Sequence, residues 1–372
     1  MSPPVPHDVS MATWARVAAV VVLLLAGAGL AAVLLRAGAD DTAGQHTVAC
    51  RNDDGDADRI QDAIDDSADG DEIVLAGTCL VDETIVLRGA RGYRGASAAT
   101  VVREARGSNL PAVLASDSWA ANSQDTGSPI SLRDLTIDAN AKENPRAGDG
   151  VVIRSWRSQI ADLHIIDAKQ NCLRLTSRSQ NGTDLTSTQV AGTIRGVFAQ
   201  RCGDNGVYVE DKVNSVTDWN LVETVVGETG GDGIAMENAG GWTVRANHVY
   251  DAGGSGIDVF RLFATTITAN YVEDFGTGSG LKAYLQGDAA SVIDGNKLFQ
   301  AGDRQDGVLL DLIGSSQGRS VATVTANVLV GNGTGTGLSY RTEGATLAVT
   351  STGNSVSGVA TPLTGVPPDA GY

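Results

Sequence analysis

The chain has 372 residues, a formal net charge of −17, 46 glycines and only 5% aromatic residues. Such an acidic chain offers no basic field to gather phosphates, so we expect no nucleic-acid partner, and the charge also weighs mildly against a strongly polyanionic substrate. Abundant glycine and scarce aromatic residues suit many short strands and tight turns better than a helical bundle.

An uncharged run, residues 17–35, follows a short N-terminal tail, residues 1–16. Nineteen helical residues would span roughly 28 Å, about the thickness of a bilayer core, so we predict a transmembrane or signal-anchor helix. The alternative is a secretory signal cleaved near residues 37–39, although the apolar core of such signals is usually shorter, at about 7–15 residues.

Residues 36–49 are predicted to be a polar linker. The acidic pair Asp40 and Asp41, together with the repetitive domain that follows, favours residues 40–372 outside the cytoplasm. The expected protein is therefore a single-pass protein of the cell membrane, or a secreted protein if the helix is removed.

A short helix is predicted to begin at Asp56 or Asp58, because acidic residues favour the first helical turn. Its apolar face would cover the open end of a strand stack and consists of Ile60, Ala63, Ile64 and Ala68. The alternating aspartates at 54, 56 and 58 resemble a calcium loop, but the glycine at the sixth position and the distal glutamate are missing, so the helix is the preferred interpretation.

The chain has four cysteines. Cys50 and Cys79 are predicted to form a disulfide in an oxidising compartment, which would contribute on the order of 3 kcal/mol. Cys172 and Cys202 lie on neighbouring repeats but four positions apart, so a bridge is possible there and two buried thiols are favoured. No Cys-x-x-Cys or histidine pair has metal-ligand spacing.

A repeat organises the chain and is clearest from Thr243 to Leu281, where Thr-Val-Arg-Ala-Asn and a Gly-x-Gly-Ile/Leu segment recur. The eight intervals between glycine markers run from residue 150 to residue 358 and average about 26 residues, which fits three strands and three turns per coil at about 4.8 Å per coil. We take the markers to be Gly150, Cys172 in place of glycine, Gly206, Gly233, Gly256, Gly280, Gly307, Gly337 and Gly358. The prediction is an all-β, single-stranded parallel β-helix over residues 50–365, with a C-terminal tail, residues 366–372.

One asparagine recurs in each of five coils, and amide side chains in register can hydrogen-bond along a stack. We predict a structural ladder of Asn247, Asn270, Asn296, Asn327 and Asn354.

The strand after each marker alternates, which assigns two outward columns on one face. The first column is Val152, Arg174, Tyr208, Ala235, Asp258, Lys282, Leu309 and Ser339, and the second is Arg154, Thr176, Glu210, Glu237, Phe260, Tyr284, Asp311 and Arg341. Aromatic rings beside carboxylates suit a sugar-binding groove, because rings stack on sugars and acids bond hydroxyls or transfer protons.

We therefore predict four catalytic residues, Glu210, Glu237, Asp258 and Lys282. Five further residues are predicted to bind substrate, and they are Tyr208, Phe260, Tyr284, Asp311 and Arg261. Glu210 and Glu237 would lie about 5 Å apart, so that one is a raised-pKa acid or both hold a calcium ion. The alternative is an ordinary solvated face.

Residues 56–77 carry Asp-x-x-x-Ile-Gln-x-Ala-Ile-Asp and then Gly-Asp-x-Ile-x-Leu-x-Gly. This pattern resembles the start of pectin-lyase-like right-handed β-helix proteins, a superfamily that includes polygalacturonases, pectate lyases and alginate- and chondroitin-type lyases. The resemblance implies a right-handed solenoid through about residue 360 and a polysaccharide partner.

Two short motifs bear on the reaction. Residues 231–234, Gly-Asp-Gly-Ile, are similar to the first acidic motif of polygalacturonases, and residues 203–206, Gly-Asp-Asn-Gly, resemble the second, but their order along the chain is reversed. The Gly-His-Gly and Arg-Ile-Lys motifs of that family and the Asp-Pro-His motif of mannuronan epimerases are absent, which disfavours both activities. A calcium-assisted lyase stays open, with the acids above and Lys282 or Arg261 as base.

The sequence thus predicts a membrane-tethered β-helix that acts on polysaccharide as a lyase or glycoside hydrolase. A non-catalytic surface module that binds glycan, and a structural role that could include a homo-oligomer, are the alternatives.

Overall fold

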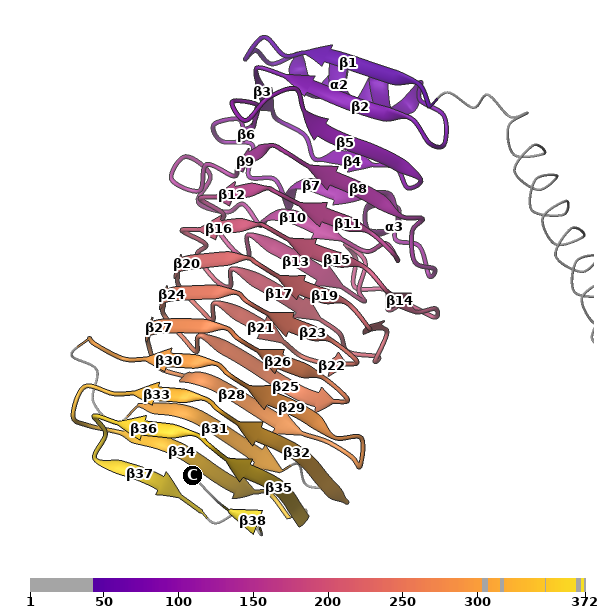
Figure 1. Ribbon diagram of the computed structural model, residues 1–372. Coiled ribbons are helices and arrows are strands. Elements are labelled where there is room, and N and C mark those ends of the chain that lie inside the picture. Colours follow the sequence, from indigo (N-terminus) through magenta and orange to yellow (C-terminus); the bar gives the residue numbers. More distant parts are fainter. Residues whose placement is uncertain (1–42, 303–306, 315–317, 345, 366–368, 371–372) are drawn as a thin grey trace, which may run out of the picture. The chain divides into compact units, whose positions relative to one another are not determined.

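The computed structural model describes residues 43–302, 307–314, 318–344, 346–365 and 369–370. Over these ranges the chain forms a parallel β-solenoid in which each coil contributes one strand to each of three long sheets (Figure 1). The predicted membrane helix, residues 17–35, lies outside the described residues. Within the described ranges, no helix combines the length and apolar character needed to cross a membrane.

Sheet A has 13 strands. They are β1 (Gln45–Ala49), β2 (Glu72–Ala76), β5 (Arg91–Gly95), β8 (Ile130–Arg133), β11 (Gln159–Ala161), β15 (Thr193–Arg195), β19 (Asn220–Val222), β23 (Thr243–Arg245), β26 (Thr266–Thr268), β29 (Ser291–Asp294), β32 (Arg319–Thr325), β35 (Thr346–Thr352) and β38 (Asp369–Ala370).

Sheet B has 11 strands. They are β3 (Thr78–Val81), β6 (Val101–Glu104), β9 (Thr136–Asp138), β12 (His164–Ile166), β16 (Phe198–Gln200), β20 (Val225–Thr229), β24 (His248–Ala252), β27 (Tyr271–Phe275), β30 (Lys297–Phe299), β33 (Val328–Val330) and β36 (Ser355–Ser357).

Sheet C has 12 strands and carries the candidate site. They are β4 (Ile85–Leu87), β7 (Ala112–Ser116), β10 (Asp149–Ile153), β13 (Leu173–Thr176), β17 (Val207–Glu210), β21 (Ile234–Met236), β25 (Ile257–Phe263), β28 (Ser279–Leu285), β31 (Val308–Gly314), β34 (Thr336–Thr342), β37 (Thr361–Thr364) and the short β22 (Ala239–Gly240), which pairs with β25. A separate pair joins β14 (Gln189–Val190) to β18 (Val216–Thr217).

The solenoid extends beyond both predicted boundaries. β1 pairs with β2 and so belongs to the first coil, although the sequence assigns residues 45–49 to a linker. At the other end, β38 lies in the predicted C-terminal tail and pairs with β35. Both segments are short strands on the outer edge of sheet A, and neither carries the glycine marker from which the coils were counted.

Alternation along each strand builds the core. In β25, Ile257 and Val259 are fully buried while Asp258 between them is partly exposed. The same arrangement repeats coil after coil, so the inward aliphatic side chains stack into one continuous hydrophobic core along the solenoid.

The five recurring asparagines form a buried ladder beside this core. The Nδ2 atom of Asn247 donates to Oδ1 of Asn270 at 3.0 Å, and Asn270 donates likewise to Asn296 at 2.9 Å. The series continues through Asn327 to Asn354, again at 2.9 Å for each step. Each amide also donates to a backbone carbonyl, so these buried polar groups are satisfied by the coils on both sides.

A helix closes the N-terminal end of the core, as the apolar pattern predicts. This helix, α2 (Asp56–Asp65), buries Ile60 and Ile64 against the first strands of the solenoid. Asp56 is buried and accepts hydrogen bonds from the backbone N–H groups of Arg51, Asp53 and Leu80. Although burial opposes it, these bonds lower the pKa of Asp56. The carboxylate therefore anchors the helix to the first turn.

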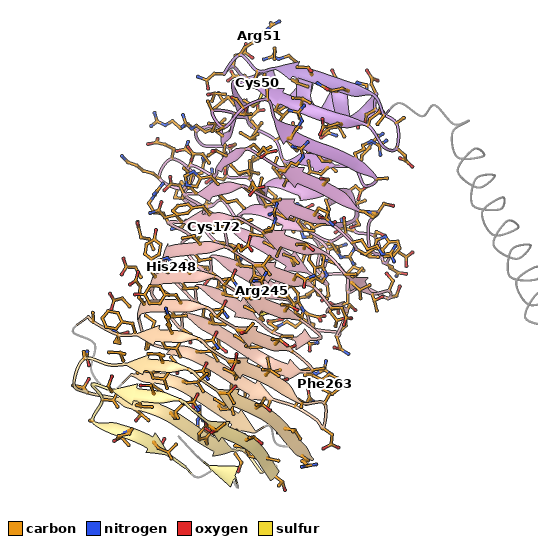
Figure 2. All side chains as sticks on the ribbon, viewed as in Figure 1. Cys50, Arg51, Cys172, Arg245, His248 and Phe263 are labelled. Carbon is orange, nitrogen blue, oxygen red and sulfur yellow. A yellow bond between two sulfur atoms is a disulfide. The ribbon has the colours of Figure 1, made fainter. Side chains whose placement is uncertain are left out.

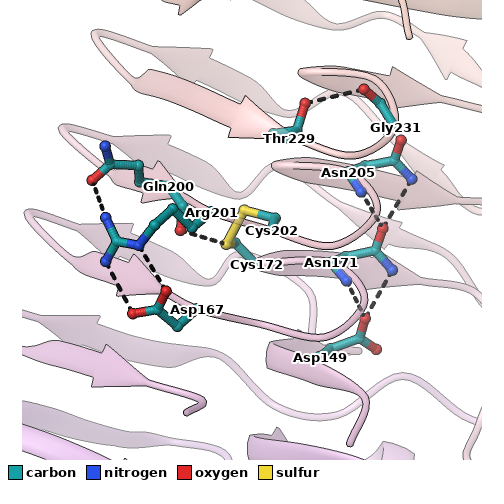
Figure 3. Close-up of a disulfide and its surroundings, with 10 residues drawn as sticks. All are labelled: Asp149, Asp167, Asn171, Cys172, Gln200, Arg201, Cys202, Asn205, Thr229 and Gly231. Atoms are coloured by element: carbon teal, nitrogen blue, oxygen red, sulfur yellow. Dashed lines mark hydrogen bonds and ion pairs between the residues drawn. A yellow bond between two sulfur atoms is a disulfide. The ribbon is translucent and has the colours of Figure 1, made fainter. Parts of the chain in front are cut away.

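Two disulfides join neighbouring coils, and Figure 2 labels one cysteine of each. The predicted bridge between Cys50 and Cys79 is present. Cys172 and Cys202 are also bridged, with their Cα atoms 5.4 Å apart, so the preference for two buried thiols was wrong (Figure 3). Four extended residues would separate the two columns by about 13 Å, but the chain curls tightly between sheets B and C, where the N–H of Gly203 donates to the carbonyl of Ala168.

The glycine count slips near the C-terminus. Val308 pairs with Ser279 and Leu310 with Leu281, so Leu309 and not Gly307 occupies the marker position of its coil. In the last coil the marker position is taken by Pro362 in the same way. Asp311 consequently belongs to the first outward column, beside Lys282, and not to the second as predicted.

Candidate functional site

An open groove of about 800 Å³ lies on the outer face of sheet C across β17, β21, β25 and β28. The hollow arises because Ala235 has a short side chain between Tyr208 and Asp258, its neighbours on the adjacent strands. The lining residues are Asp204, Asn205, Tyr208, Asp211, Lys212, Asp232, Ala235, Met236, Glu237, Asp258, Phe260, Lys282 and Tyr284.

The turn before each strand of sheet C forms one margin of the groove and is held by a second polar ladder. Nδ2 of Asn171 donates to Oδ1 of Asp149 at 2.8 Å, and Nδ2 of Asn205 donates to Oδ1 of Asn171 at 2.9 Å (Figure 3). The series continues when the N–H of Asp232 donates to Asn205 and the N–H of Ser255 donates to Asp232. The turns are thus fixed, and the side chain of Asp232 is fixed with them.

The surroundings of Asp232 raise the pKa of its carboxyl group. Burial raises the pKa of its carboxyl group, and the negative charges of Asp258 and Asp204 raise the pKa further, against the hydrogen bond from Ser255 and the positive charge of Lys282. A carboxyl group whose pKa is raised in this way is better suited to donate a proton than an ordinary aspartate.

Asp258 occupies a contrasting environment. Its Oδ2 atom accepts a hydrogen bond from Nζ of Lys282 at 2.9 Å, one coil further on. Although burial opposes it, this contact raises the pKa of Lys282. The ammonium group therefore stays charged and holds the side chain of Asp258 in a fixed position.

Glu237 is fixed by three donors at the other margin. Its Oε1 atom accepts from the hydroxyl of Tyr208 and from Nζ of Lys212, both at 2.8 Å, and its Oε2 atom accepts from the N–H of Asp211 at 3.1 Å. Burial and the carboxylate of Glu237 raise the pKa of Tyr208, so the phenol remains a donor. Glu237 therefore has a structural task as well as a place in the groove.

Two aromatic rings stand beside these acids. Phe260 is 63% exposed, and its ring lies 5.0 Å from that of Tyr284 with the two planes tilted by 45°. Nζ of Lys282 lies 5.2 Å from the centre of the Tyr284 ring. The register between β25 and β28 shifts between Val259 and Leu262, and this irregularity includes Phe260. The exposed face of the Phe260 ring and the neighbouring Tyr284 ring give the groove a flat apolar surface beside its acids.

The structure brings most of the predicted site residues together. Tyr208, Glu237, Asp258, Phe260, Lys282 and Tyr284 line the groove. Three predicted residues do not line it. Glu210 points to the preceding coil and contacts Arg174 and Thr176, Asp311 pairs with Arg341, and Arg261 donates to Gln286 and Asn238.

The predicted pair of stacked glutamates is therefore divided between different partners. Each glutamate accepts hydrogen bonds from the coil before it. Glu210 accepts from Arg174, and Glu237 accepts from Tyr208 and Lys212. Within the described ranges, no group of three or more histidine, cysteine or acidic side chains is arranged to hold a metal ion.

Sequence reasoning missed Asp204 and Asp232 as site residues, together with Asp211 and Lys212. Asp232 belongs to a series of small polar residues that precede the strands of sheet C, and such residues are typical of tight turns. The signal that could have found them is the pair of acidic motifs at residues 203–206 and 231–234, whose aspartates both lie at the groove.

Comparisons with known proteins agree with this architecture. The family described as "Right handed beta helix region" matches residues 119–298 and 187–362. No curated protein matches the chain.

Several solved structures share the fold. The A-module of mannuronan C-5 epimerase AlgE4 from Azotobacter vinelandii is 17% identical with a TM-score of 0.52, covering 86% of this chain and 96% of that one. The surface adhesin PfbA of Streptococcus pneumoniae is 14% identical with a TM-score of 0.59, covering 86% and 91%. DFA-IIIase from Arthrobacter chlorophenolicus A6 is 15% identical with a TM-score of 0.55, covering 83% and 81%. At such identities the likeness shows the fold, and together with the family match it establishes that this chain belongs to the right-handed β-helix family.

Proposed function

We propose that the groove on sheet C binds a polysaccharide poor in acidic groups and hydrolyses one of its glycosidic bonds. The observation that carries this proposal is the meeting of two carboxyl groups in contrasting environments, Asp232 and Asp258, beside the exposed ring of Phe260. Two carboxyl groups beside one sugar site are the arrangement that glycoside hydrolysis needs, one to donate a proton and the other to act as the carboxylate.

The two acids have complementary tasks in this reaction. Asp232, whose pKa is raised by burial, gives its proton to the glycosidic oxygen as the bond to the anomeric carbon breaks. Asp258, which accepts a hydrogen bond from Lys282, supplies the carboxylate that stabilises the positive charge on the sugar and accepts a proton from the attacking water. Phe260 and Tyr284 support the apolar faces of the sugar rings.

The charge of the groove favours a neutral substrate. Five carboxyl groups line it, Asp204, Asp211, Asp232, Glu237 and Asp258, against two lysines. Lys212 is already paired with Glu237 and Lys282 with Asp258, at 2.8 Å and 2.9 Å. A lyase must neutralise the carboxylate of a uronic acid, and no cation among these lining residues is left for that purpose, so hydrolysis is favoured over elimination.

The disulfides support a compartment outside the cytosol. Two disulfides link neighbouring coils, and disulfides persist in oxidising surroundings outside the cytosol. We therefore place the solenoid outside the cytoplasm, where polysaccharides of cell walls and of the surroundings are accessible.

The test uses the full-length chain and two panels of polysaccharides. Inulin, dextran, linear β-glucan, xylan and mannan form the neutral panel, and alginate, polygalacturonate and chondroitin form the acidic one. New reducing ends report hydrolysis and unsaturated products report elimination, each measured with calcium and with a chelator. We expect new reducing ends from a neutral polymer, no effect of the chelator, and loss of turnover in Asp258→Asn.

A matched control is Asp162→Asn, an exposed aspartate outside the groove that pairs loosely with Arg195. It should keep full activity. Unsaturated products from alginate that require calcium would instead establish a lyase. Binding that depends on Phe260 without any turnover would establish a glycan-binding module, the function that the exposed ring alone would support.

A further inference from the structure

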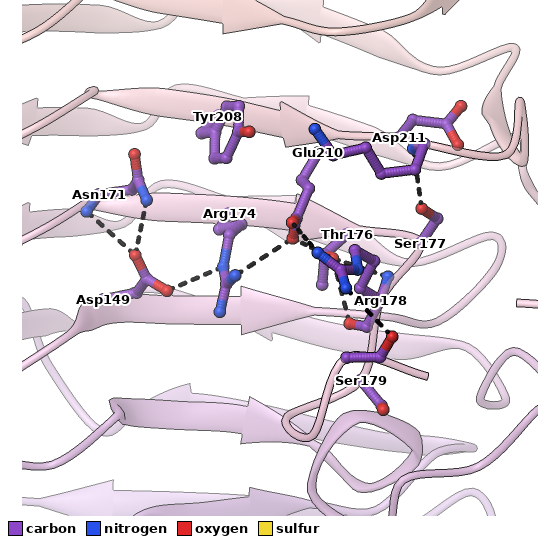
Figure 4. Close-up of polar contacts among 12 residues, drawn as sticks. Asp149, Asn171, Arg174, Thr176, Ser177, Arg178, Ser179, Tyr208, Glu210 and Asp211 are labelled. Carbon is purple, nitrogen blue, oxygen red and sulfur yellow. Dashed lines mark hydrogen bonds and ion pairs between the residues drawn. The ribbon is translucent and has the colours of Figure 1, made fainter. Parts of the chain in front are cut away.

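A row of charged side chains crosses the outer face of sheet C directly N-terminal to the groove. Asp149 lies at the start of β10, Arg174 lies on β13, and Glu210 ends β17 (Figure 4). Nε of Arg174 lies 2.8 Å from Oδ2 of Asp149, and Nη1 lies 3.2 Å from Oε2 of Glu210. These three residues, called the bar from here on, connect one margin of the sheet to the other.

The bar is firmly held at its Glu210 end. The hydroxyl of Thr176 donates to Oε2 of Glu210 at 2.7 Å, and Nη1 of Arg178 lies 3.8 Å from Oε1. At the other end, Nδ2 and the N–H of Asn171 both donate to Oδ1 of Asp149. The side chains of Asp149, Arg174 and Glu210 are only 1%, 19% and 12% exposed, so the bar is a packed wall and not a set of free surface charges.

The face beyond the bar is covered. The guanidinium of Arg174 lies 5.8 Å from the ring of Trp119, which belongs to α3 (Asp117–Ala120). Trp119 packs with Ala112, Ala115 and Val152 into a small buried cluster over β7 and β10. These are the strands on which the groove floor would otherwise continue.

The covering segment is clamped in place by a buried arginine. Arg154 is fully buried, and its Nη1 atom donates to the carbonyls of Ser118 at 3.1 Å and Ser123 at 2.7 Å, while Nη2 donates to that of Thr183 at 3.3 Å. The segment after β7 and the segment after β13 are thereby tied to each other and to the sheet. The cover is a fixed part of the fold.

We propose that the groove is closed at the bar and therefore receives the end of a glycan chain and not an internal stretch of it. The terminal sugar lies against Arg174, next to Tyr208, which is its neighbour in register on β17. The rest of the chain passes Asp232 and Asp258 and leaves over Phe260 and Tyr284. This inference rests on the proposed function in that it assumes a glycan in the groove, but it does not require that the glycan is cleaved.

Binding stoichiometry tests the proposal without turnover. Size fractions of the neutral polysaccharide with the highest affinity in the panel are saturated with the full-length Asp258→Asn protein, and bound protein per polymer chain is measured by analytical ultracentrifugation. An end-directed groove gives a stoichiometry that stays constant as the chains lengthen. A stoichiometry that rises in proportion to chain length would overturn the proposal.

Product size tests it in the active protein. End-directed cleavage gives a single short product and little loss of viscosity for each new reducing end, whereas a random mixture of lengths with a rapid loss of viscosity contradicts the closed end. Opening the wall with Asp149→Asn, Arg174→Met and Trp119→Ala should shift the products toward that mixture. This combination makes position 149 neutral and leaves Glu210 with Arg178 as its cation. The Arg201→Ala control removes another arginine–aspartate pair, with Asp167, away from the groove and should leave the product pattern unchanged.

The two proposals fail in different ways. If the stoichiometry is constant but the wild-type protein forms no product, the proposal of a closed end stands and the proposal of a hydrolase is wrong. Products of random length with normal turnover would retain the hydrolase and remove the closed end. If none of the neutral or acidic polymers binds, both proposals are overturned.

Discussion

At the scale of single residues, the groove exists because one small side chain stands between larger ones. Ala235 leaves the floor open, and Tyr208 and Asp258 rise on either side of it. Asp232 and Asp258 then differ in what surrounds them, one partly buried at the turn and the other paired with Lys282. The position of each group therefore follows from the coil, while its chemistry follows from its neighbours.

Phe260 is predicted to contribute to binding and little to stability. Phe260→Ala removes a ring that is 63% exposed, so the free energy of unfolding should hardly change. Affinity for a glycan should fall by about tenfold, or about 1.4 kcal/mol, because the stacking surface is lost. Calorimetric titration measures this. Val328→Ala, another exposed apolar residue but on sheet B, should leave the affinity unchanged, and an equal loss there would contradict the assignment of the ring.

Glu104 is a buried acid that the proposed reaction does not use. It is 1% exposed, and its Oε1 atom accepts from the N–H of Leu110 at 2.8 Å and from the hydroxyl of Ser108 at 3.3 Å. Burial raises the pKa of Glu104 from 4.5 to about 7. The folded state therefore holds a proton that the unfolded chain releases above about pH 4.5.

A pH dependence of stability follows, with its sign set by that upward shift. The contribution of the protonated group is fully present below about pH 4.5 and is lost as the pH rises through about 7, which amounts to about 3 kcal/mol in the free energy of unfolding. Glu104→Gln should remove this loss, so the variant gains stability relative to the wild type between pH 4.5 and pH 8. Denaturant unfolding at both pH values checks it, with the exposed Glu83→Gln as control. A constant difference between variant and wild type would refute the raised pKa.

At the scale of elements, the strands are too short to be stable alone, and the ladders join them. Strands of three residues such as β23 and β26 gain their stability from neighbours above and below. The asparagine ladder adds a buried side-chain contact between successive coils, and the Asp149–Asn171–Asn205 ladder does the same at the groove margin.

Breaking the central rung should destabilise several coils together. Asn296→Ala leaves the backbone N–H of Asn270 without its acceptor and removes the side-chain donor to the carbonyl of Ile267. It also removes one of the two acceptors of the Asn270 amide and one of the two donors to Oδ1 of Asn327. Each buried group left unsatisfied costs about 1–3 kcal/mol, so a loss of several kcal/mol in the free energy of unfolding is expected. The control Asn220→Ala removes an exposed asparagine from β19 and should cost little. Equal losses of unfolding free energy in the two variants would show that the asparagine ladder does not stabilise the solenoid.

Much of the fold and about half of the site could be predicted from the sequence, for physical reasons that differ. Alternation and the recurring asparagine identify strands and faces, because every coil repeats the same spacing. The turns vary in length, so the tight curl that brings Cys172 to Cys202 carried no periodic signal. Asp232 recurs in a column of small polar turn residues, and this recurrence indicates a structural role and conceals its place at the groove. Asp311 was displaced because its coil places Leu309 where the other coils have glycine. Glu210 lies in the second outward column, as predicted, but its side chain contacts Arg174 on the preceding coil and not Glu237.

At the scale of the whole molecule, a capping helix and two disulfides stabilise the N-terminal part of the solenoid. Helix α2 covers the first coil, and the two disulfides lie between coils and not at the ends of the chain. Each bridge spans about one coil in sequence, 29 residues for Cys50–Cys79 and 30 for Cys172–Cys202. They tie together neighbours that the sheets already pair.

Loss of the second bridge is predicted to lower stability without changing the fold. Replacing both cysteines, Cys172→Ser and Cys202→Ser, should lower the free energy of unfolding by about 3 kcal/mol, the value expected for a loop of this length. Thermal unfolding followed by circular dichroism measures the loss. Reduction of the wild-type protein should have a larger effect, because both bridges open. Identical melting of oxidised and reduced protein would mean that the bridges do not support the solenoid.

The number of coils between the bar and Asp258 fixes the distance from the closed end of the groove to this acid. Three strand spacings separate β13, which carries Arg174, from β25, which carries Asp258, or about 14 Å at ordinary inter-strand distances. Adjacent strands of the groove belong to successive coils. Duplicating or deleting a whole coil between β13 and β25 would therefore move the wall by about 4.8 Å relative to Asp258, and every strand would still have a neighbour on each side. Under the proposed reaction, the number of coils between the wall and the acids would set the length of the released oligosaccharide. A change of product size could then evolve by gain or loss of a repeat without any change in Asp232 or Asp258.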